Sequence, residues 1–349
     1  MKNLRKCILM IASCLFFVAI LEAQQIVTGQ ITDATDGTPI QGCHVFIANT
    51  TVGKTSDANG NYSITVKGNG SFEIVVSHVG FEPYVHKIDT PQSFHQHDVA
   101  LKIRVLQEVV ITARKSYSQR DIDLFWSKVL GEKPSKNGIE VLNPEKVYYF
   151  LNSDKVLKAS CQEPIEIINH QMGYRISYVL HSFEHDYQNG ASTFFGTPHF
   201  EELISQDTQQ NNRWEKKRQE VYDVSITRFL RSLYKEKIEE DGFLISNAYS
   251  LKQRQKVPLK DILQHEQDLA LVSIENPLLL MCYAKPITNR IIQNSFRDLI
   301  AGMPIVMELL PQQIIIYSDG TYSGVLQIRE IQGYIFGLSA MLPVEFSGL

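Results

Sequence analysis

The stretch that decides the fold of the N-terminal part is residues 56–66, Ser56-Asp57-Ala58-Asn59-Gly60-Asn61-Tyr62-Ser63-Ile64-Thr65-Val66. Asn59-Gly60 readily adopts positive φ, so this pair predicts a tight turn. After the turn, Tyr62, Ile64 and Val66 alternate with polar residues, which places all three on one face of a strand. The stretch therefore predicts a hairpin turn followed by a strand with one apolar face.

Short apolar segments separated by turns lie on both sides of this stretch. They cover residues 27–31, 43–47, 72–77 and 99–103, with a further strand expected to start at 80–84. Six or seven short strands within about 90 residues are typical of a small β-sandwich. We therefore predict an all-β domain over residues 24–113.

Four spaced blocks of this domain follow one known pattern, at residues 27–31, 38–45, 56–64 and 77–81. They resemble the carboxypeptidase-like regulatory domain, a transthyretin-like sandwich that is common in cell-envelope proteins of Gram-negative bacteria. In its namesake enzymes this domain accompanies a separate zinc peptidase domain. The resemblance thus implies a sandwich and an envelope address, but no peptidase activity.

Residues 106–113, Leu-Gln-Glu-Val-Val-Ile-Thr-Ala, end the domain. They look like the stretch that follows this module in TonB-dependent outer-membrane receptors. The later residues lack the serial alternating segments of a receptor barrel. The stretch is therefore either a last edge strand leading into a linker or a contact with an energy-coupling partner.

Residues 114–349 combine helical and strand patterns. Apolar residues recur at helical spacing over 121–130, and Gly131 follows as a stop signal. A helical stretch over 213–241 is expected to break near Val224-Ser225, where Ser225 can cap the second helix. Strands are expected at residues 156–160, 165–168, 174–183, 192–195, 243–248, 269–274, 278–284, 313–318 and 324–328. This order predicts an α+β domain.

The second half also resembles a large uncharacterised family whose members pair the same sandwich with such a domain. The resemblance rests on residues 173–180, 214–222, 229–233 and 342–346. Val224 and Arg228 depart from it, where Gly and His are usual. Because that family has no assigned chemistry, the resemblance implies an architecture and an address without a mechanism.

The N-terminus has the pattern of a secretory signal. Lys2, Arg5 and Lys6 precede an apolar run over residues 7–21, shorter than the roughly 20 residues of a membrane span. Cleavage after Ala23 would define residues 1–23 as a signal peptide. A lipoprotein signal ending at Cys14 and an uncleaved anchor are the alternatives. The sequence predicts export to the periplasm or the outer-membrane periphery.

Charge and cysteine content narrow the function class. The formal net charge is −4, which argues against binding nucleic acid through bulk charge. Cys43, Cys161 and Cys282 remain after cleavage, far apart and without CxxC spacing. They are expected to be small buried apolar residues, although one disulfide is permitted in an oxidising compartment.

One motif resembles a zinc peptidase string. Residues 181–185, His-Ser-Phe-Glu-His, fit HxxEH, but that chemistry needs a helix to bring both His side chains to one metal. The preceding residues alternate as a strand, so His181 and His185 would lie about 13 Å apart at roughly 3.3 Å per residue. His95 and His97 could share a strand face, but a surface pair is the commoner case. No metal site and no catalytic set is predicted.

One constellation remains as a candidate binding site. If residues 213–224 are helical, Trp214, Arg218 and Tyr222 lie on one stripe, and Arg218 could stack on either aromatic. Arg228, with Arg231 and Lys235, would extend a basic side. The stripe is either a platform for an anionic ligand or glycan, or a core-facing surface whose Arg is held by a carboxylate.

These observations predict a non-enzymatic, secreted envelope protein without a cofactor. Its expected role is binding or scaffolding of an envelope protein or glycan partner. A hydrolase acting on envelope peptide or glycan, and an accessory to a TonB-dependent uptake system, are the alternatives. The hydrolase is disfavoured because no nucleophile–base pair or metal set can be assembled from the sequence.

Overall fold

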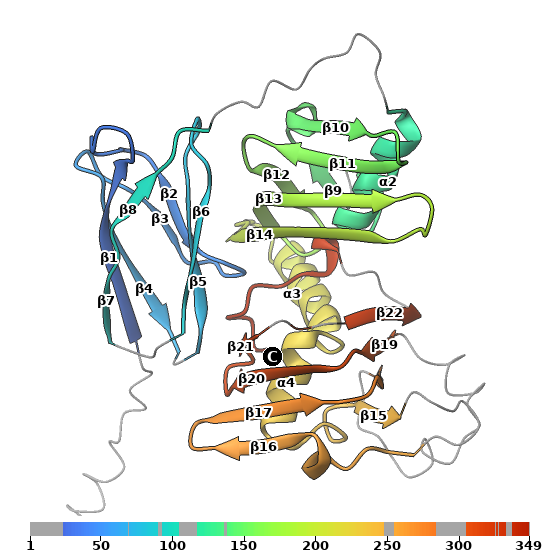
Figure 1. Ribbon diagram of the computed structural model, residues 1–349. Coiled ribbons are helices and arrows are strands. Elements are labelled where there is room, and N and C mark those ends of the chain that lie inside the picture. Colours follow the sequence, from blue (N-terminus) through green and yellow to red (C-terminus); the bar gives the residue numbers. More distant parts are fainter. Residues whose placement is uncertain are drawn as a thin grey trace, which may run out of the picture.

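The computed structural model describes residues 24–68, 70–89, 93–104, 117–135, 138–247, 255–283, 305–324, 326, 328–332 and 337–348. The predicted signal peptide over 1–23 and the receptor-like stretch over 106–113 lie outside the described residues. The described chain forms three units, each with its own hydrophobic core. Figure 1 shows the first unit beside the other two.

The first unit is the predicted β-sandwich. One sheet holds β1 (Gln24–Asp33), β4 (Asn61–Lys67), β7 (Phe94–Gln96) and β8 (Val99–Leu101). The other holds β2 (His44–Ile47), β3 (Gly53–Thr55), β5 (Phe72–Ser77) and β6 (Tyr84–Ile88). Between the sheets lie the alternating side chains, for example Val27 of β1 and its cross-strand neighbour Ile64 of β4.

The turn before β4 forms as predicted. The carboxylate of Asp57 accepts the backbone N–H groups of Asn59 (2.9 Å) and Asn61 (2.8 Å), and Gly60 has φ of 74°. The strand expected from residue 80 begins only at Tyr84, because Gly80 adopts φ of 88° in a turn. Strands β3 and β7, three residues each, were too short to predict from alternation.

The second unit packs one helix on one face of a six-stranded antiparallel sheet. The helix is α2 (Gln119–Leu130), which ends at Gly131 as predicted. The strands are β9 (Ile139–Val141), β10 (Val147–Leu151), β11 (Val156–Cys161), β12 (Ile165–Asn169), β13 (Tyr174–Asp186) and β14 (Ser192–Glu202). The long strand β13 pairs with β12 and then β11 along one edge and with β14 along the other. Phe125 of α2 meets Phe183 of β13 edge to face.

The third unit packs helix α4 (Ile226–Tyr234) against two four-stranded sheets. One has the order β15 (Phe243–Asn247), β18 (Leu278–Cys282), β19 (Ile305–Leu309), β22 (Ile328–Gln332). The other has the order β16 (Leu263–Glu266), β17 (Leu269–Ile274), β20 (Gln312–Tyr317), β21 (Tyr322–Ser323). Of the described residues in the strand expected at 324–328, only Ile328 lies in a strand, at the start of β22, and Gly324 follows β21 with φ of 107°.

Two helices connect the second and third units. They are α3 (Thr208–Tyr222) and α4 (Ile226–Tyr234), and Ser225 caps α4 by accepting the N–H of Arg228 at 3.1 Å. The predicted break and cap are therefore confirmed. The helical stretch differs at its ends: α3 starts earlier, at an Asp207 cap, and α4 gives way to turns after Tyr234.

The sandwich docks on the outer face of the six-stranded sheet, opposite α2. Phe46 and Val75 of the sandwich bury Val179 of β13 in a small cluster. Nearby, His44 of β2 meets His199 of β14 with ring centroids 4.9 Å apart. The chain is thus multi-domain, with an all-β sandwich followed by α+β structure built on two cores.

Candidate binding cleft

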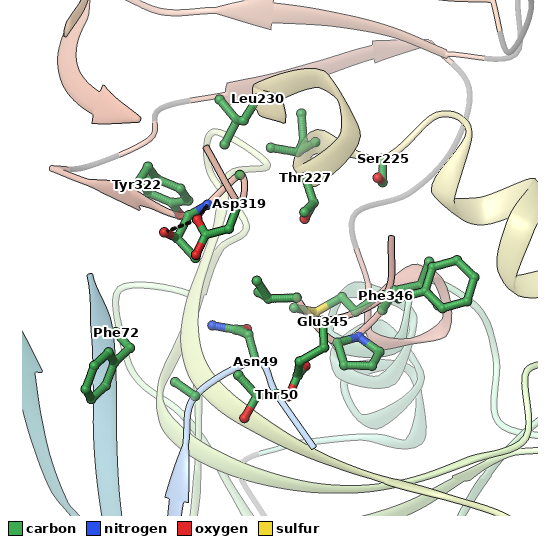
Figure 2. A pocket seen from close by; sticks show the side chains of 18 of the residues that line it. Asn49, Thr50, Phe72, Ser225, Thr227, Leu230, Asp319, Tyr322, Glu345 and Phe346 are labelled. Carbon is green, nitrogen blue, oxygen red and sulfur yellow. Dashed lines mark hydrogen bonds between the residues drawn. The ribbon is translucent and has the colours of Figure 1, made fainter. Parts of the chain in front are cut away.

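A cleft of about 2200 Å³ lies where the three units meet. Its walls come from the β2–β3 and β4–β5 turns of the sandwich, the α3–α4 junction, the β20–β21 turn and the C-terminal segment 337–347. Figure 2 shows Asn49, Thr50 and Glu345 at one side, Asp319 and Tyr322 at another, and Thr227 and Leu230 of α4 above them.

The C-terminal segment joins the sandwich to the rest of the chain at one side of the cleft. The backbone N–H of Val344 donates to the carbonyl oxygen of Asn49 (2.8 Å). The carboxylate of Glu345 accepts the N–H of Thr51 at 2.9 Å and its hydroxyl at 3.2 Å. The Asn49 N–H in turn donates to the carbonyl oxygen of Pro198 in β14. The β2–β3 turn is therefore held by the second unit and by the segment.

Arg231 of α4 holds the same segment from the other side. Its guanidinium donates to the carbonyl oxygens of Val344 (2.6 Å), Phe346 (2.7 Å) and Asp319 (2.7 Å). It also donates to the Tyr222 hydroxyl at 3.0 Å. One cation thus fixes the C-terminal segment, the β20–β21 turn and the end of α3, because a planar fork can serve several acceptors.

A second contact joins the sandwich to the third unit on the other side of the cleft, next to the β20–β21 turn. Lys87 of β6 donates to the Ser323 hydroxyl (2.9 Å) and pairs with Asp89 (3.1 Å). Asp89 also accepts from Ser323 (3.2 Å) and from Ser71 (2.8 Å). The sandwich therefore contacts the rest of the chain on two sides of the cleft, at the C-terminal segment and at Ser323.

Gly70 allows this second approach. A Cβ at Gly70 would lie 2.0 Å from Oγ1 of Thr321 and 2.9 Å from a carboxylate oxygen of Asp319. Thr321 cannot move freely, because its N–H and hydroxyl both donate to the Asp319 carboxylate. A residue without a side chain is therefore required at position 70.

Burial shifts the pKa of two groups at the cleft. The pKa of Glu73 is raised by burial, with the Lys87 cation opposing the shift and the Asp89 carboxylate adding to it. The pKa of Tyr322 is raised by burial and by the Glu73 charge. At neutral pH the phenol is therefore a hydrogen-bond donor as well as an acceptor.

The predicted stripe on α3 lies beside the cleft, and its side chains form hydrogen bonds with other parts of the same chain. Nε1 of Trp214 donates to the His170 carbonyl oxygen at 2.9 Å. Arg218 donates to the carbonyl oxygens of Met172 (2.7 Å) and Gly173 (3.0 Å), pairs with Glu202 and lies 4.0 Å over the Tyr174 ring.

The other two predicted residues are also engaged. Tyr222 accepts from Arg231 and meets Phe346 edge to face. Arg228 donates to the Asp223 carbonyl oxygen and pairs with the carboxylates of Asp223 and Asp241. Of the four predicted binding residues, Tyr222 lines the cleft, whereas Trp214, Arg218 and Arg228 hold neighbouring backbone in place.

The histidine motif lies on a strand, as its alternation predicted. Both residues belong to β13, and their ring nitrogens contact different groups: His181 contacts Thr197 (2.7 Å) and His185 contacts Ser192 (2.8 Å). His95 contacts Gln25, and His97 contacts Tyr84. In the part of the chain that the structure describes, no three His, Cys, Asp or Glu side chains gather closely enough to hold a metal ion.

The three cysteines lie in three different cores. Cys43, Cys161 and Cys282 are buried free thiols in the first, second and third unit, respectively. Burial raises the pKa of each thiol, that of Cys282 to about 12.

Among the described helices, none combines the length and apolar character needed to cross a membrane.

Comparisons with known proteins identify the first unit. The family model of the CarboxypepD_reg-like domain matches residues 27–111, so the chain carries a carboxypeptidase regulatory-like domain. No curated protein matches the chain.

Among solved structures, catechol 1,2-dioxygenase from Acinetobacter sp. ADP1 aligns at 13% identity and a TM-score of 0.20, over 26% of this chain and 55% of that one. A DUF3823 family protein from Bacteroides ovatus aligns at 12% and 0.20, over 52% and 82%. A putative membrane-associated protein of unknown function from Bacteroides fragilis aligns at 14% and 0.19, over 53% and 84%. The chain spans about half the length of the first two structures that it matches, 55% and 51%.

Proposed function

We propose that this protein is a non-enzymatic binding or scaffolding protein of the cell envelope, and that its cleft takes an extended segment of an envelope partner protein. The observation that carries the proposal is the size and composition of the cleft. At about 2200 Å³ it exceeds the roughly 300–1,000 Å³ of a small-molecule pocket. A space of this size suits a segment of a polymer.

The groups that line the cleft support a peptide as the occupant. Partly exposed apolar side chains of the walls, such as Phe346 and Met341, offer surface for side chains of a partner. The Asn49 amide lies in the cleft and can both donate to and accept from a peptide backbone.

A binding role is favoured over a hydrolase by how the polar groups of the walls are used. The Asp319 carboxylate accepts from Thr321, Glu345 accepts from Thr51, and the Ser225 hydroxyl accepts from the Arg228 N–H. These groups hold turns and a helix end in place, and none is paired as a nucleophile with a base.

The envelope address rests on the regulatory-like domain and on the signal pattern over residues 1–23. N-terminal sequencing of the exported protein is expected to begin at Gln24. A lipid-modified Cys14 at the N-terminus would contradict cleavage after Ala23 and indicate a membrane anchor.

A photo-crosslinking residue tests the cleft directly. Placed at Thr227, which lines the cleft on α4, it is expected to give one discrete adduct in cells. The same residue at Ile204, which is exposed elsewhere on the chain, should not give this adduct. Thr227→Trp should obstruct the cleft beside α4 and so reduce crosslinking of the partner to a second crosslinker placed at Thr51. No discrete adduct from Thr227, or the same adduct from both positions, would refute the proposal.

A further inference from the structure

The outer face of the six-stranded sheet is covered by the sandwich over only part of its area. Val179, Thr197 and His199 lie under the sandwich and are buried. Further along the same strands and on β10, three aromatic side chains on this face remain open to solvent. They are Tyr148 (49% exposed), Phe150 (49%) and Phe195 (53%). The open area is thus continuous with the surface on which the sandwich already docks.

Strand pairing places these aromatic residues on opposite sides of a polar strip. Phe150 of β10 is opposite Lys158 of β11, Lys158 is opposite Glu184 of β13, and Glu184 is opposite Thr193 of β14. Phe195 is opposite Ser182 in the next row of this face. Three strand spacings of about 4.8 Å separate β10 from β14, so the face is about 14 Å wide.

The polar strip carries no net charge. Nζ of Lys158 and Oε1 of Glu184 form an ion pair at 2.7 Å, and the exposed Ser160 and Ser182 flank it. On one side of the strip, the His181 ring stacks on Phe195 with centroids 4.9 Å apart. This stacking limits the rotation of the Phe195 ring, which remains exposed.

The arrangement differs from that of a protein–protein interface. Such an interface has an apolar centre that excludes water and a polar rim. Here hydrogen-bonding groups occupy the centre and aromatic rings occupy the sides. A ligand that fits must be polar along its length, must present apolar patches to aromatic rings, and must be uncharged, because the strip has no excess charge to match.

We propose that this face binds a neutral oligosaccharide chain across β10, β11, β13 and β14. Sugar rings would lie against Tyr148, Phe150 and Phe195 through their C–H faces. Sugar hydroxyl groups would donate to Glu184 and accept from Lys158, both of which retain free hydrogen-bonding capacity beyond their mutual contact. The site meets the cleft at Phe195, which also lines the cleft, whereas Tyr148, Phe150, Lys158 and Glu184 lie outside it. Binding of an oligosaccharide here goes beyond the binding of a partner segment in the cleft.

Titration calorimetry of the whole protein with neutral oligosaccharides tests the proposal. The probes are soluble hexasaccharides of glucose, mannose and N-acetylglucosamine. At least one should bind, and binding should persist at high salt because screening acts on charged ligands. The double variant Tyr148→Ala/Phe150→Ala should bind about tenfold more weakly, since each ring loses its stacking contact.

Two controls separate this site from the rest of the surface. Leu142→Ala removes an apolar side chain of similar exposure, 46%, and should leave affinity unchanged. Thr227→Trp, which obstructs the cleft beside α4 and not at Tyr148 or Phe150, should also leave the affinity unchanged, so a failed cleft and a failed sheet face give different results. Thermal melting of each variant checks that it is folded.

Three outcomes would overturn the proposal. The first is that none of the three hexasaccharides binds at millimolar concentration. The second is that the double variant binds as tightly as the unchanged protein. The third is a concentration-dependent dimer in sedimentation that the double variant abolishes, since the face would then be occupied by a second copy of the chain.

Discussion

Arg231 donates a 2.6 Å hydrogen bond to the carbonyl oxygen of Val344, although 113 residues separate the two. Val344 in turn donates its N–H to Asn49 of the sandwich. Helix α4, the C-terminal segment and the first unit are therefore joined in series through one residue. This series bounds one side of the cleft, and Arg231 holds it at the α4 end.

Arg231→Ala should destabilise the protein by roughly 2–4 kcal/mol, because several partly buried acceptors lose a charged donor together. Arg231→Lys should recover only part of this loss, since an ammonium group lacks the planar fork. Chemical denaturation measures both. Arg213→Ala serves as the control. It removes an exposed Arg whose ion pair with Asp207 is 3.6 Å long, so the free energy of unfolding should change little. Equal losses of stability at positions 231 and 213 would contradict the role of Arg231 in joining α4 to the C-terminal segment.

Gly70→Ala should weaken docking of the sandwich at the β20–β21 turn, because its Cβ would overlap Oγ1 of Thr321. Small-angle scattering should show a more extended protein, while the circular dichroism of the units stays unchanged. Thr321→Ala removes the overlapping atom, so the double variant should be less perturbed than the sum of the two single variants. Strict additivity would show that the two residues are not in contact.

Acid should weaken the contact between the sandwich and the six-stranded sheet. Burial, followed by the His44 ring, lowers the pKa of His199 to about 4, while the Thr50 backbone opposes the shift. The pKa of His44 is also lowered by burial, against the charges of Glu201 and Glu166. Nδ1 of His199 has no hydrogen-bond partner among the described residues.

Because the folded protein holds His199 neutral, the unfolded chain binds more protons below its ordinary pKa of about 6.5. Stability from this contact is present above that pH and is lost as the pH falls toward about 4. Melting temperature should therefore fall more steeply over this range in the unchanged protein than in His199→Leu. Identical pH profiles of the two proteins would refute the assignment.

Trp214→Ala should cost roughly 1–3 kcal/mol of stability, less than a fully buried Trp, because the ring is only partly covered. The loss comes from packing on Gly173 and from the bond to the His170 carbonyl oxygen. Denaturation measures it, and binding of the crosslinked partner is followed in parallel. Unchanged stability with lost binding would instead support the ligand platform predicted from the sequence.

Local signals in the sequence account for much of the fold. The Asn59-Gly60 pair, the Gly131 stop and the Ser225 cap each act within a few residues, and each lies where it was predicted. The alternation before His181 likewise placed the motif on a strand. Such features depend on backbone preferences that neighbouring residues decide, so a single sequence reveals them.

The cleft depends on contacts that no local pattern reveals. The acceptors of Arg218 and Arg231 are mostly backbone carbonyl oxygens, which every residue carries and no motif marks. Residues 342–346 carry no local signal beyond a family resemblance, since five residues show no periodicity. Gly70 could have been noticed as one of two nearby glycines, but its role follows from Thr321, which is distant in the sequence.

The bond between Thr51 and Glu345 joins positions 294 residues apart. During synthesis the sandwich leaves the ribosome early and, as an N-terminal domain, can fold before the rest of the chain exists. Its docking partner on the C-terminal segment emerges only after both other cores have been made. Nascent chains stalled before residue 343 should therefore already contain the sheet face on which the sandwich docks but lack the bonds to Val344 and Glu345, so closure of this side of the cleft becomes a late step of biosynthesis.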